Sequence, residues 1–248
     1  MHPSSSIMQT ANRFLRSRLS PEVYSVVRRW IDWLMPYGQT SYSQFGEDLF
    51  LARRFADKND GYFVDVGAYH PRQLSNTYAL YRRGWRGINI DATPDSMKLF
   101  QVLRPRDVNV EAAVSNVPGA IAFSSWGSSP ENTAYRPQID GVSAAHGTGK
   151  VVNLSAVPLS ELIAKLPDRP RQIDLLNVDV EGHDLEVLRS FDWQSYKPTI
   201  VIVEQFSESI HELVESDLYA FMSARGYQLV SWHRPSLIFE RSAVSDAT

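Results

Sequence analysis

Cysteine is absent from the 248-residue chain, so disulfides, thiolate zinc sites, iron–sulfur clusters and a cysteine nucleophile are all excluded. Apolar runs are short, and none approaches the roughly 18 residues that a transmembrane helix needs. The first 30 residues lack the apolar core and the small-residue cleavage site of a signal peptide. Together these absences predict a soluble, cytoplasmic protein with no transmembrane segment.

Basic residues are also slightly outnumbered by acidic ones. The chain has 25 Lys and Arg against 28 Asp and Glu, which gives a net charge of −3. Because nucleic-acid binders rely on a basic surface to neutralise phosphates, we expect no nucleic-acid partner. The charge is unevenly distributed, however, since residues 1–36 contain five Arg against Glu22 and Asp32. The rest of the composition, with 43% hydrophobic and 21% charged residues, is typical of a globular protein.

Residues 1–40 are predicted to be an N-terminal extension built around an amphipathic helix. Ser20 and Pro21 are typical of a helix start, and apolar residues recur at helical spacing from Val23 to Leu34. Such an apolar face suits packing on the protein's own domain or on a second copy, so a homodimer formed through this helix is one expectation. A basic amphipathic helix on a membrane surface or on a partner protein is the other.

Residues 41–241 alternate short apolar runs with helical patterns, which predicts an α/β domain, and residues 242–248 are predicted to be a flexible tail. Apolar strands that alternate with helices favour a doubly wound, mostly parallel sheet covered on both faces. Strands are expected at residues 63–67, 87–91, 108–114, 173–180, 199–204, 227–232 and 237–240, with residues 121–123 pairing back on 108–114. Helices are expected at residues 75–83, from 93 onward, and at 157–166, 184–191 and 208–225. Because the last two strands have no helix between them, they are expected to form an antiparallel hairpin.

The segment 124–150 departs from this pattern. It is rich in Ser, Gly and Pro and has almost no apolar periodicity. Because a loop of this length within a compact domain is usually functional or disordered, we predict that it forms a lid over the substrate site. His146 lies within the segment, either as a catalytic base that closes over the acceptor or as a solvated loop residue.

Acidic residues stand at the end of every strand of the predicted parallel set. In sheets of this type, ligands bind beyond the carboxyl ends of the strands, where the strand order reverses. One acid at such a position commonly caps the following helix, but like charges at all of these strand ends would repel each other. The pattern therefore predicts a site for a cationic ligand or a metal ion. These acids are Asp65, Asp91, Glu111, Asp179, Glu181 and Glu204.

The turn after the first strand has a single glycine, Gly67, and the second strand ends at Asp91. An acid at the latter position can accept hydrogen bonds from both ribose hydroxyls of a nucleoside. A dinucleotide fold needs three glycines to admit the pyrophosphate, so NAD and ATP fit this turn poorly. S-adenosylmethionine (SAM), a nucleoside without phosphate that carries a positive sulfonium, fits better. The alternative is a turn glycine and a capping aspartate with no ligand.

Five stretches of the sequence resemble the FkbM-type family of SAM-dependent methyltransferases. They extend from about Tyr42 to Phe206 and read SQFGEDLFL, FVDVGAYHP, SNTYALYRRGWRGINIDATP, LLNVDVEGHDLEVL and IVIVEQF. The resemblance is absent from residues 1–40 and 127–150. It implies the class I methyltransferase fold, in which a doubly wound, mostly parallel sheet of seven strands ends in an antiparallel hairpin. It also implies O-methylation of hydroxyls on sugars and natural products.

The resemblance further implies a SAM site formed by four of the motifs. The turn after the first strand would line the methionine part, and the end of the second strand would bind the ribose. The end of the third strand would meet the edge of the adenine, and the leading motif would close over the cofactor. In the same order, the residues are Asp65 and Gly67; Asp91; Glu111 and Ala112; and Gln44, Glu47 and Asp48.

Methyl transfer is an in-line displacement, so catalysis consists mainly of positioning the reactants and removing the proton of the acceptor. A sugar hydroxyl is so weak an acid that it needs a base or a metal ion. Asp179, Glu181 and Glu204 offer hard oxygen ligands suited to Mg²⁺. Alternatively, Glu181 and Asp184 only cap the next helix, and Asp179 accepts a hydrogen bond from the acceptor.

Two histidines are candidates for the general base. His183 lies in the first turn of a predicted helix, where the positive end of the helix dipole lowers its pKa and favours the neutral form. His146, in the predicted lid, is the alternative. Asp179, which is expected to organise the acceptor, completes the candidate catalytic set.

The sequence thus predicts a SAM-dependent O-methyltransferase. Its expected acceptor is a hydroxyl of a sugar, of an oligosaccharide or polysaccharide precursor, or of a glycosylated metabolite. A SAM-binding protein without catalytic activity and a methyltransferase for a non-sugar natural product are the alternatives. A nucleic-acid methyltransferase is disfavoured because the chain lacks an aromatic base-flipping motif such as Asn-Pro-Pro-Tyr.

Overall fold

The computed structural model describes residues 10, 13–34, 38–126, 132 and 149–242, and the chain divides into two compact units, residues 1–40 and 41–248. In the first unit, α2 (Pro21–Leu34) begins where Ser20 Oγ accepts a hydrogen bond from the backbone N–H of Val23 (3.4 Å), as the sequence predicts. No residue of α2 is buried. Among the described residues, no helix is both long and apolar enough to cross a membrane.

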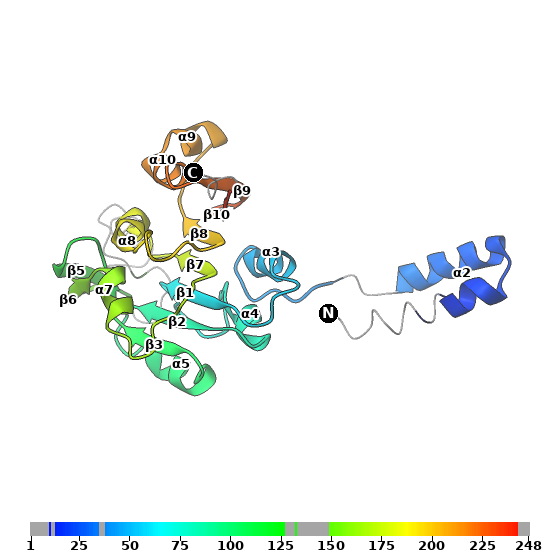
Figure 1. Cartoon of the computed structure of the whole chain (residues 1–248), viewed down its shortest axis with the longest axis horizontal. Coiled ribbons are helices and arrows are strands. Elements are labelled where there is room, and N and C mark those ends of the chain that lie inside the picture. Colours follow the sequence, from blue (N-terminus) through cyan, green and yellow to red (C-terminus); the bar gives the residue numbers. More distant parts are fainter. Residues whose placement is uncertain (1–9, 11–12, 35–37, 127–131, 133–148, 243–248) are drawn as a thin grey trace. The chain divides into compact units, whose positions relative to one another are not determined.

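The second unit is built on a sheet that has seven strands within the described residues (Figure 1). All neighbouring strands are parallel as far as β8 (Ile200–Glu204), and β10 (Ser236–Arg241) is antiparallel to both β8 and β9 (Tyr227–His233). This arrangement confirms the doubly wound α/β fold with a mostly parallel sheet and a C-terminal antiparallel hairpin. The spatial order is β3 (Val108–Glu111), β2 (Arg86–Asp91), β1 (Tyr62–Val66), β7 (Leu175–Val178), β8 (Ile200–Glu204), β10 (Ser236–Arg241) and β9 (Tyr227–His233).

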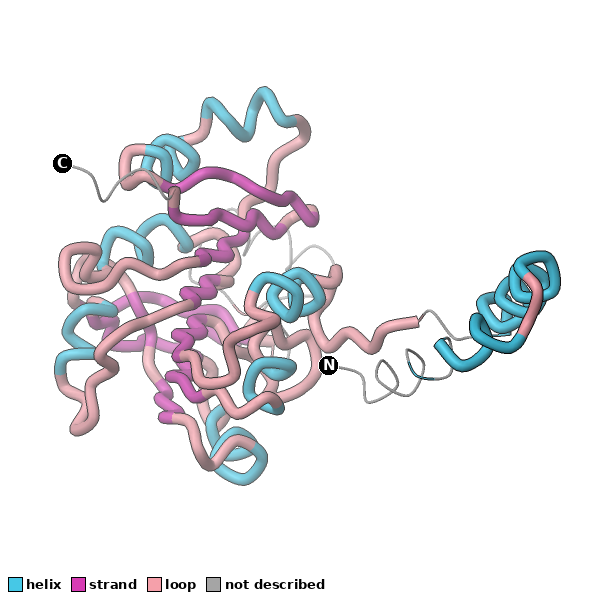
Figure 2. The backbone as a smooth tube through the Cα atoms, turned by 45° about the vertical axis from the view of Figure 1, so that its right-hand side comes forward, coloured by secondary structure: helices cyan, strands magenta, loops and turns pink. Residues whose placement is uncertain are grey.

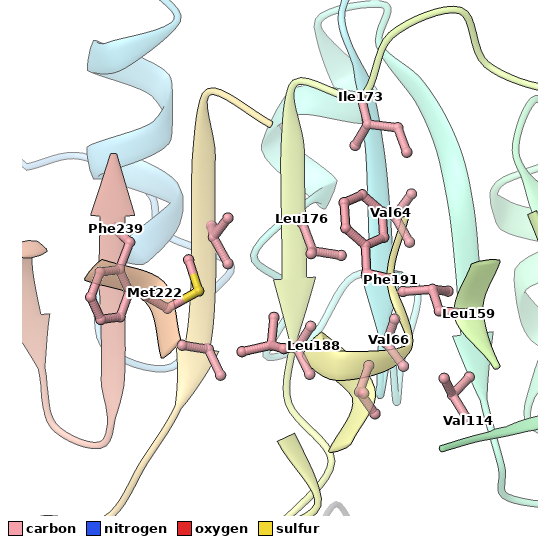
Figure 3. Close-up of a cluster of buried hydrophobic side chains, with 14 of the residues drawn as sticks. Val64, Val66, Val114, Leu159, Ile173, Leu176, Leu188, Phe191, Met222 and Phe239 are labelled. Carbon is pink, nitrogen blue, oxygen red and sulfur yellow. The ribbon is translucent and has the colours of Figure 1, made fainter. Parts of the chain in front are cut away.

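Helices cover both faces of this sheet (Figure 2). Figure 3 shows Leu159, Leu188 and Met222 within the larger apolar core, which they share with strand residues such as Val64. The helices of this face are α7 (Leu159–Ala164), α8 (Asp184–Ser190), α9 (Ile210–Glu215) and α10 (Asp217–Ser223). Leu51 and Leu80 anchor the opposite face, which is covered by α3 (Glu47–Arg54) and α4 (Tyr78–Arg82). The remaining helix, α5 (Met97–Leu103), packs on Ala68 in the turn after β1.

A second, smaller sheet replaces the hairpin predicted near residue 121. The apolar run 108–114 divides, because β3 ends at Glu111 and the next residues form β4 (Ala113–Val114) in a separate sheet. The order of this sheet, within the described residues, is β4, β6 (Lys150–Val157) and β5 (Gly119–Ser125), with β5 antiparallel to β6. The predicted pairing of 121–123 with 108–114 is therefore wrong, since the partner strand comes from the far side of the 124–150 segment.

Two helix predictions also change. The helix expected from residue 157 begins at Leu159, because β6 continues to Val157. The helix expected over 208–225 is interrupted at Ser216, whose backbone is extended (φ −72°, ψ 151°) and whose hydroxyl accepts a hydrogen bond from the backbone N–H of Tyr219 to cap α10. Most of the predicted lid, including His146, and the predicted tail from residue 243 onward lie outside the described residues.

Candidate active site

A cavity lies at the carboxyl ends of the parallel strands, where the strand order reverses between β1 and β7. Side chains from the smaller sheet, including Val114, Ile121 and Phe123, give it one apolar side. Its open space measures about 70 Å³, well below the roughly 300–1,000 Å³ of pockets that hold small molecules. A ligand the size of a nucleoside would therefore enter only if the lining moved apart. The sequence-predicted residues in the lining are Gly67, Asp91, Ala112, Asp179, Glu181 and His183.

Gly67 allows the end of β1 to approach the turn after β7. Its φ of +80° is a backbone conformation that residues other than glycine rarely adopt. A Cβ atom at this position would lie 1.6 Å from the carbonyl oxygen of Asp179. The backbone N–H groups of Gly67 and Ala68 both donate to the carbonyl of Ile90 (2.9 and 3.1 Å), which closes the turn over β2. The single glycine of the motif is thus required by the backbone itself.

Asp91 lies at the end of β2 and lines the cavity. One carboxylate oxygen accepts a hydrogen bond from the backbone N–H of Tyr69 (2.9 Å), and the other accepts from that of Thr93 (2.7 Å). These two bonds fix the orientation of the carboxylate, while each oxygen keeps a further lone pair. Both carboxylate oxygens of Asp91 are thereby held in fixed positions, where they can accept hydrogen bonds from the two hydroxyls of a vicinal diol.

Asp65 does not belong to the lining of the cavity as the described residues define it. It lies within β1, in register with Asn89 of β2 and Asn177 of β7, one position before the strand ends at Val66. Its carboxylate accepts hydrogen bonds from Thr77 Oγ1 (2.6 Å) and Asn177 Nδ2 (2.8 Å). Burial raises the pKa of Asp65, and these hydrogen bonds together with the nearby Arg104 partly offset that effect. The residue predicted to line the methionine part of the cofactor therefore belongs to a buried polar network behind the site.

The leading motif is likewise placed outside the described lining. Glu47 is buried and accepts hydrogen bonds from the backbone N–H of Phe45 (2.9 Å) and from Ser236 Oγ (2.7 Å). Asp48 is buried and accepts from Ser41 Oγ, Ser43 Oγ and the backbone N–H of Tyr42 at 2.6–2.8 Å. Their carboxylates hold the start of α3. The third residue predicted to close over the cofactor, Gln44, is exposed, as is Glu111, whose carboxylate accepts from the backbone N–H of Asp95.

Three carboxylates meet at one end of the cavity. Oxygen atoms of Asp179, Glu181 and Glu204 lie within 4.8 Å of one another. Burial and then the repulsion between the two acids raise the pKa of Glu204 to about 11, while burial raises that of Asp179, to which it is hydrogen-bonded, to about 6. The pair therefore retains one proton at pH 7. Glu204 Oε2 is buried and has no hydrogen-bond partner among the described residues.

The turn that follows β7 presents His183 to the cavity. Glu181 (φ +54°) and Gly182 (φ +94°) bend it tightly, and Asp184 accepts hydrogen bonds from the backbone N–H groups of Val180 (3.3 Å) and Gly182 (3.0 Å). Burial raises the pKa of Asp184 well above its ordinary value. Burial lowers the pKa of His183, whose Nε2 lies 3.0 Å from Ser115 Oγ. Asp184 therefore caps the turn, and a neutral imidazole faces the cavity.

Two features of the site have no signal in the sequence. Asn132 lines the cavity, accepts a hydrogen bond from the backbone N–H of Trp126 (2.8 Å) and donates one to Thr93 Oγ1 (3.1 Å). It lies in a segment without periodicity, so no pattern could single it out. A second hollow of about 390 Å³ is lined by Asp184, Glu204 and Phe206, among others. Because Asp179 lines the first cavity and is hydrogen-bonded to Glu204, this carboxylate pair lies between the two hollows.

Three solved structures with weak similarity to this chain are methyltransferases. A TehB-like SAM-dependent methyltransferase from Corynebacterium glutamicum has 10% identity and a TM-score of 0.42, covering 88% of this chain and 97% of that one. An O-methyltransferase from Bacillus cereus in complex with SAH has 11% identity and a TM-score of 0.39, covering 93% and 96%. A precorrin-6y C5,15-methyltransferase from Geobacter metallireducens has 11% identity and a TM-score of 0.40, covering 77% and 85%.

No significant match to a curated protein is found. Residues 65–229, about two thirds of the chain, match the methyltransferase FkbM domain. The matched region includes Gly67, Asp91, Asp179 and Glu204, so it contains the cavity and the carboxylate pair beside it. The chain belongs to the FkbM methyltransferase family.

Proposed function

We propose that this protein is a SAM-dependent O-methyltransferase that acts on a hydroxyl of a sugar or of a glycosylated molecule. The observation that carries the proposal is the position of the Asp179–Glu204 pair. On one side lies the cavity that Asp91 lines. On the other lies the second hollow, here called the groove, which Phe206 lines. Methyl transfer needs the acceptor oxygen in line with the methyl carbon and its sulfur, with a proton-accepting group beside that oxygen, and this pair lies where the two hollows adjoin.

The cavity has the chemistry that SAM requires. Asp91 offers two fixed oxygens to the ribose hydroxyls, and the apolar side chains of Ile90 and Phe123 suit an adenine ring. The acids around Asp179 suit the positive sulfonium and amino groups, whose charge would offset theirs. When bound, SAM would supply a methyl group activated by its positive sulfur.

The groove has features that suit a sugar. Phe206 is 61% exposed and presents an apolar ring on which the CH face of a pyranose can rest. Asp184 and Glu204 border the same groove. Carboxyl groups and an aromatic ring that line the same groove are suited to a polyhydroxylated ring, because they can bind its hydroxyls and its apolar face together.

Two groups are positioned to take the proton of the acceptor. Asp179, whose pKa of about 6 leaves it ionised above that pH, is hydrogen-bonded to Glu204 at the junction of the two hollows. His183 is neutral because burial lowers its pKa, and it lines the cavity. With either residue as the base, activity should rise with pH as the base loses its proton.

The carboxylates also fit Mg²⁺, which we propose as a second ligand of the site. Asp179, Glu181 and Glu204 provide oxygen atoms at mutual distances suited to a hard cation, and Glu204 Oε2 has no protein hydrogen bond to lose within the described residues. Bound there, Mg²⁺ would displace the shared proton and acidify the acceptor hydroxyl. Methylation that is unaffected by EDTA would argue against this ion.

The test measures SAM binding first and turnover second. Calorimetry should detect SAM or SAH binding to the native protein, and Asp91→Asn should weaken it roughly tenfold or more, because the carboxylate loses charge and one acceptor. Asp95→Asn makes the same change four residues away on an exposed side chain and should leave the affinity unchanged. Unaltered affinity in Asp91→Asn would refute the ribose assignment.

Turnover is then followed as SAH formation over a panel of free sugars, glycosides and non-sugar natural products, with and without Mg²⁺. The proposal expects SAH only with acceptors that carry a sugar hydroxyl. Binding of SAM with no SAH from any acceptor would favour a non-catalytic SAM-binding protein. Turnover confined to non-sugar acceptors would support the methyltransferase activity but contradict the proposed sugar acceptor.

A further inference from the structure

The N-terminal unit carries an apolar surface that methyl transfer does not use. Large apolar side chains of α2 are exposed, with exposed fractions from 49% to 75%. At about 100° of rotation per residue, their positions fall on one continuous strip of the helix surface. Contiguous apolar surface of this kind usually marks an interaction site. These residues, here called the α2 strip, are Val23, Val26, Trp30, Trp33 and Leu34.

The α2 strip is distinct from the part of the helix that packs within its own unit. Tyr24, Val27 and Ile31 are half-buried and lie on a neighbouring sector of the same helix. Trp30 and Trp33, by contrast, belong to the exposed strip and pack edge to face with each other (5.8 Å between ring centroids). The exposed tryptophans are therefore additional to the side chains that hold the unit together.

Charge indicates which partner covers the strip. Residues 1–40 carry five Arg and two acids, a net charge of +3, and one of those acids, Asp32, is already paired with Arg28 (2.9 Å). Arg29 borders the same shallow groove as Val26, Trp30 and Trp33. A second copy of the chain would bring another +3 unit against this one, and the like charges would oppose that contact. An anionic partner with an apolar interior satisfies both the arginines and the strip.

A bilayer with anionic headgroups is such a partner. Tryptophan and arginine are the side chains favoured at the membrane–water boundary, where an amphipathic helix lies in the plane of the surface. With 14 residues, α2 is about 21 Å long, too short to span the roughly 30 Å hydrocarbon core. We infer that the α2 strip docks the protein on an anionic lipid surface, with Trp30 and Trp33 entering the headgroup region and the arginines contacting lipid phosphates.

The experiment is co-sedimentation of the full chain with lipid vesicles. Vesicles of phosphatidylcholine mixed with phosphatidylglycerol should bind the protein at low salt, and binding should weaken at high salt because the arginine contribution is screened. Vesicles of phosphatidylcholine alone should bind it at least roughly tenfold more weakly. On the anionic vesicles the tryptophan emission should shift to the blue as Trp30 and Trp33 leave water.

Two variants separate the apolar from the charged contribution. The double substitution Trp30→Ser with Trp33→Ser should weaken binding by roughly tenfold or more and abolish most of the emission shift. Arg16→Glu with Arg18→Glu should weaken binding to a similar degree. Both sites are exposed, so circular dichroism and SAM affinity should match those of the native protein.

Matched controls lie in the other unit. Arg169→Glu with Arg171→Glu makes the same change in charge on exposed side chains, and Val102→Ser with Ile210→Ser removes exposed apolar groups. Both controls should bind vesicles like the native protein. The inference is overturned if the native chain does not sediment with anionic vesicles, or if the tryptophan variant binds them equally well. A native dimer in light scattering that the tryptophan variant converts to a monomer would assign the strip to a second copy instead.

Discussion

Glu204 carries a proton at neutral pH because it is largely buried beside Asp179 and close to Glu181. An unfolded chain would release that proton near the ordinary pKa of 4.5. Between that pH and the much higher pKa of the folded state, the folded protein binds more protons than the unfolded one. Its stability must therefore fall as the pH rises through this interval. An acid at this position therefore makes the folded protein less stable in alkaline conditions.

The raised pKa of Glu204 predicts a stabilising substitution. Glu204→Gln keeps the shape of the protonated acid but has no proton to lose, so in metal-free buffer it should raise Tm at pH 8 by roughly 2–4 °C, about 1 kcal/mol, and change Tm little at pH 4. Differential scanning calorimetry at both pH values measures it. Glu215→Gln, on an exposed side chain of α9, should show no such dependence. An equal or lower Tm for Glu204→Gln at pH 8 would contradict the shared proton.

The residues predicted to bind the cofactor differ in how well the sequence predicts their positions in the structure. Asp91 and Gly67 are predictable, because one ends a strand and the other is a turn glycine that no other residue could replace. The sequence places Asp65 within the predicted strand 63–67, but its buried partners are not predictable, because only the alignment of β1 with β7 brings it beside Asn177. A stretch of sequence records spacing along one strand and says nothing of the alignment between two.

At the level of elements, the segment before α3 makes a distinct prediction. Asp48 accepts hydrogen bonds from two serine hydroxyls and a backbone N–H, so Asp48→Ala should lower the free energy of unfolding by roughly 2–4 kcal/mol in urea titration. The SAM affinity of the remaining folded protein should change less than about twofold. Asp57→Ala, on an exposed side chain just after α3, should be near neutral for both. A loss of SAM affinity without a loss of stability would indicate that Asp48 contacts the cofactor, as the sequence predicts.

The elements of the main sheet are predictable because each is a short apolar run followed by a glycine, an acid or a helix start. The smaller sheet is not. β4 is only two residues long and continues the apolar run of β3 with one residue between them, so the sequence gives no sign that the chain changes sheets at Ala112. β6 pairs with residues some thirty positions earlier, and such distant pairing leaves no local signal.

At the scale of the whole molecule, each apolar core of the second unit is formed within residues 51–239. A unit with its own core can fold alone, so a fragment of residues 41–248 should unfold within roughly 3 °C of the full chain and bind SAM with the same affinity. It should also lose vesicle binding, since the α2 strip has been removed. A fragment that aggregates, or that unfolds far below the full chain, would show that residues 1–40 are required for the fold.

The way the smaller sheet holds the two ends of the 124–150 segment has a practical consequence. Ser125 and Lys150 are partners in the β5–β6 ladder, so the chain leaves the smaller sheet and returns to it at adjacent points. The entropy of closing a loop between two fixed ends rises only slowly with its length. A segment of different length and sequence can therefore be exchanged between these two residues without disturbing the register of either sheet. We propose that such a graft, with Asn132 retained because it lines the cavity, would test whether this segment selects the acceptor while Asp91 and Asp179 stay in place.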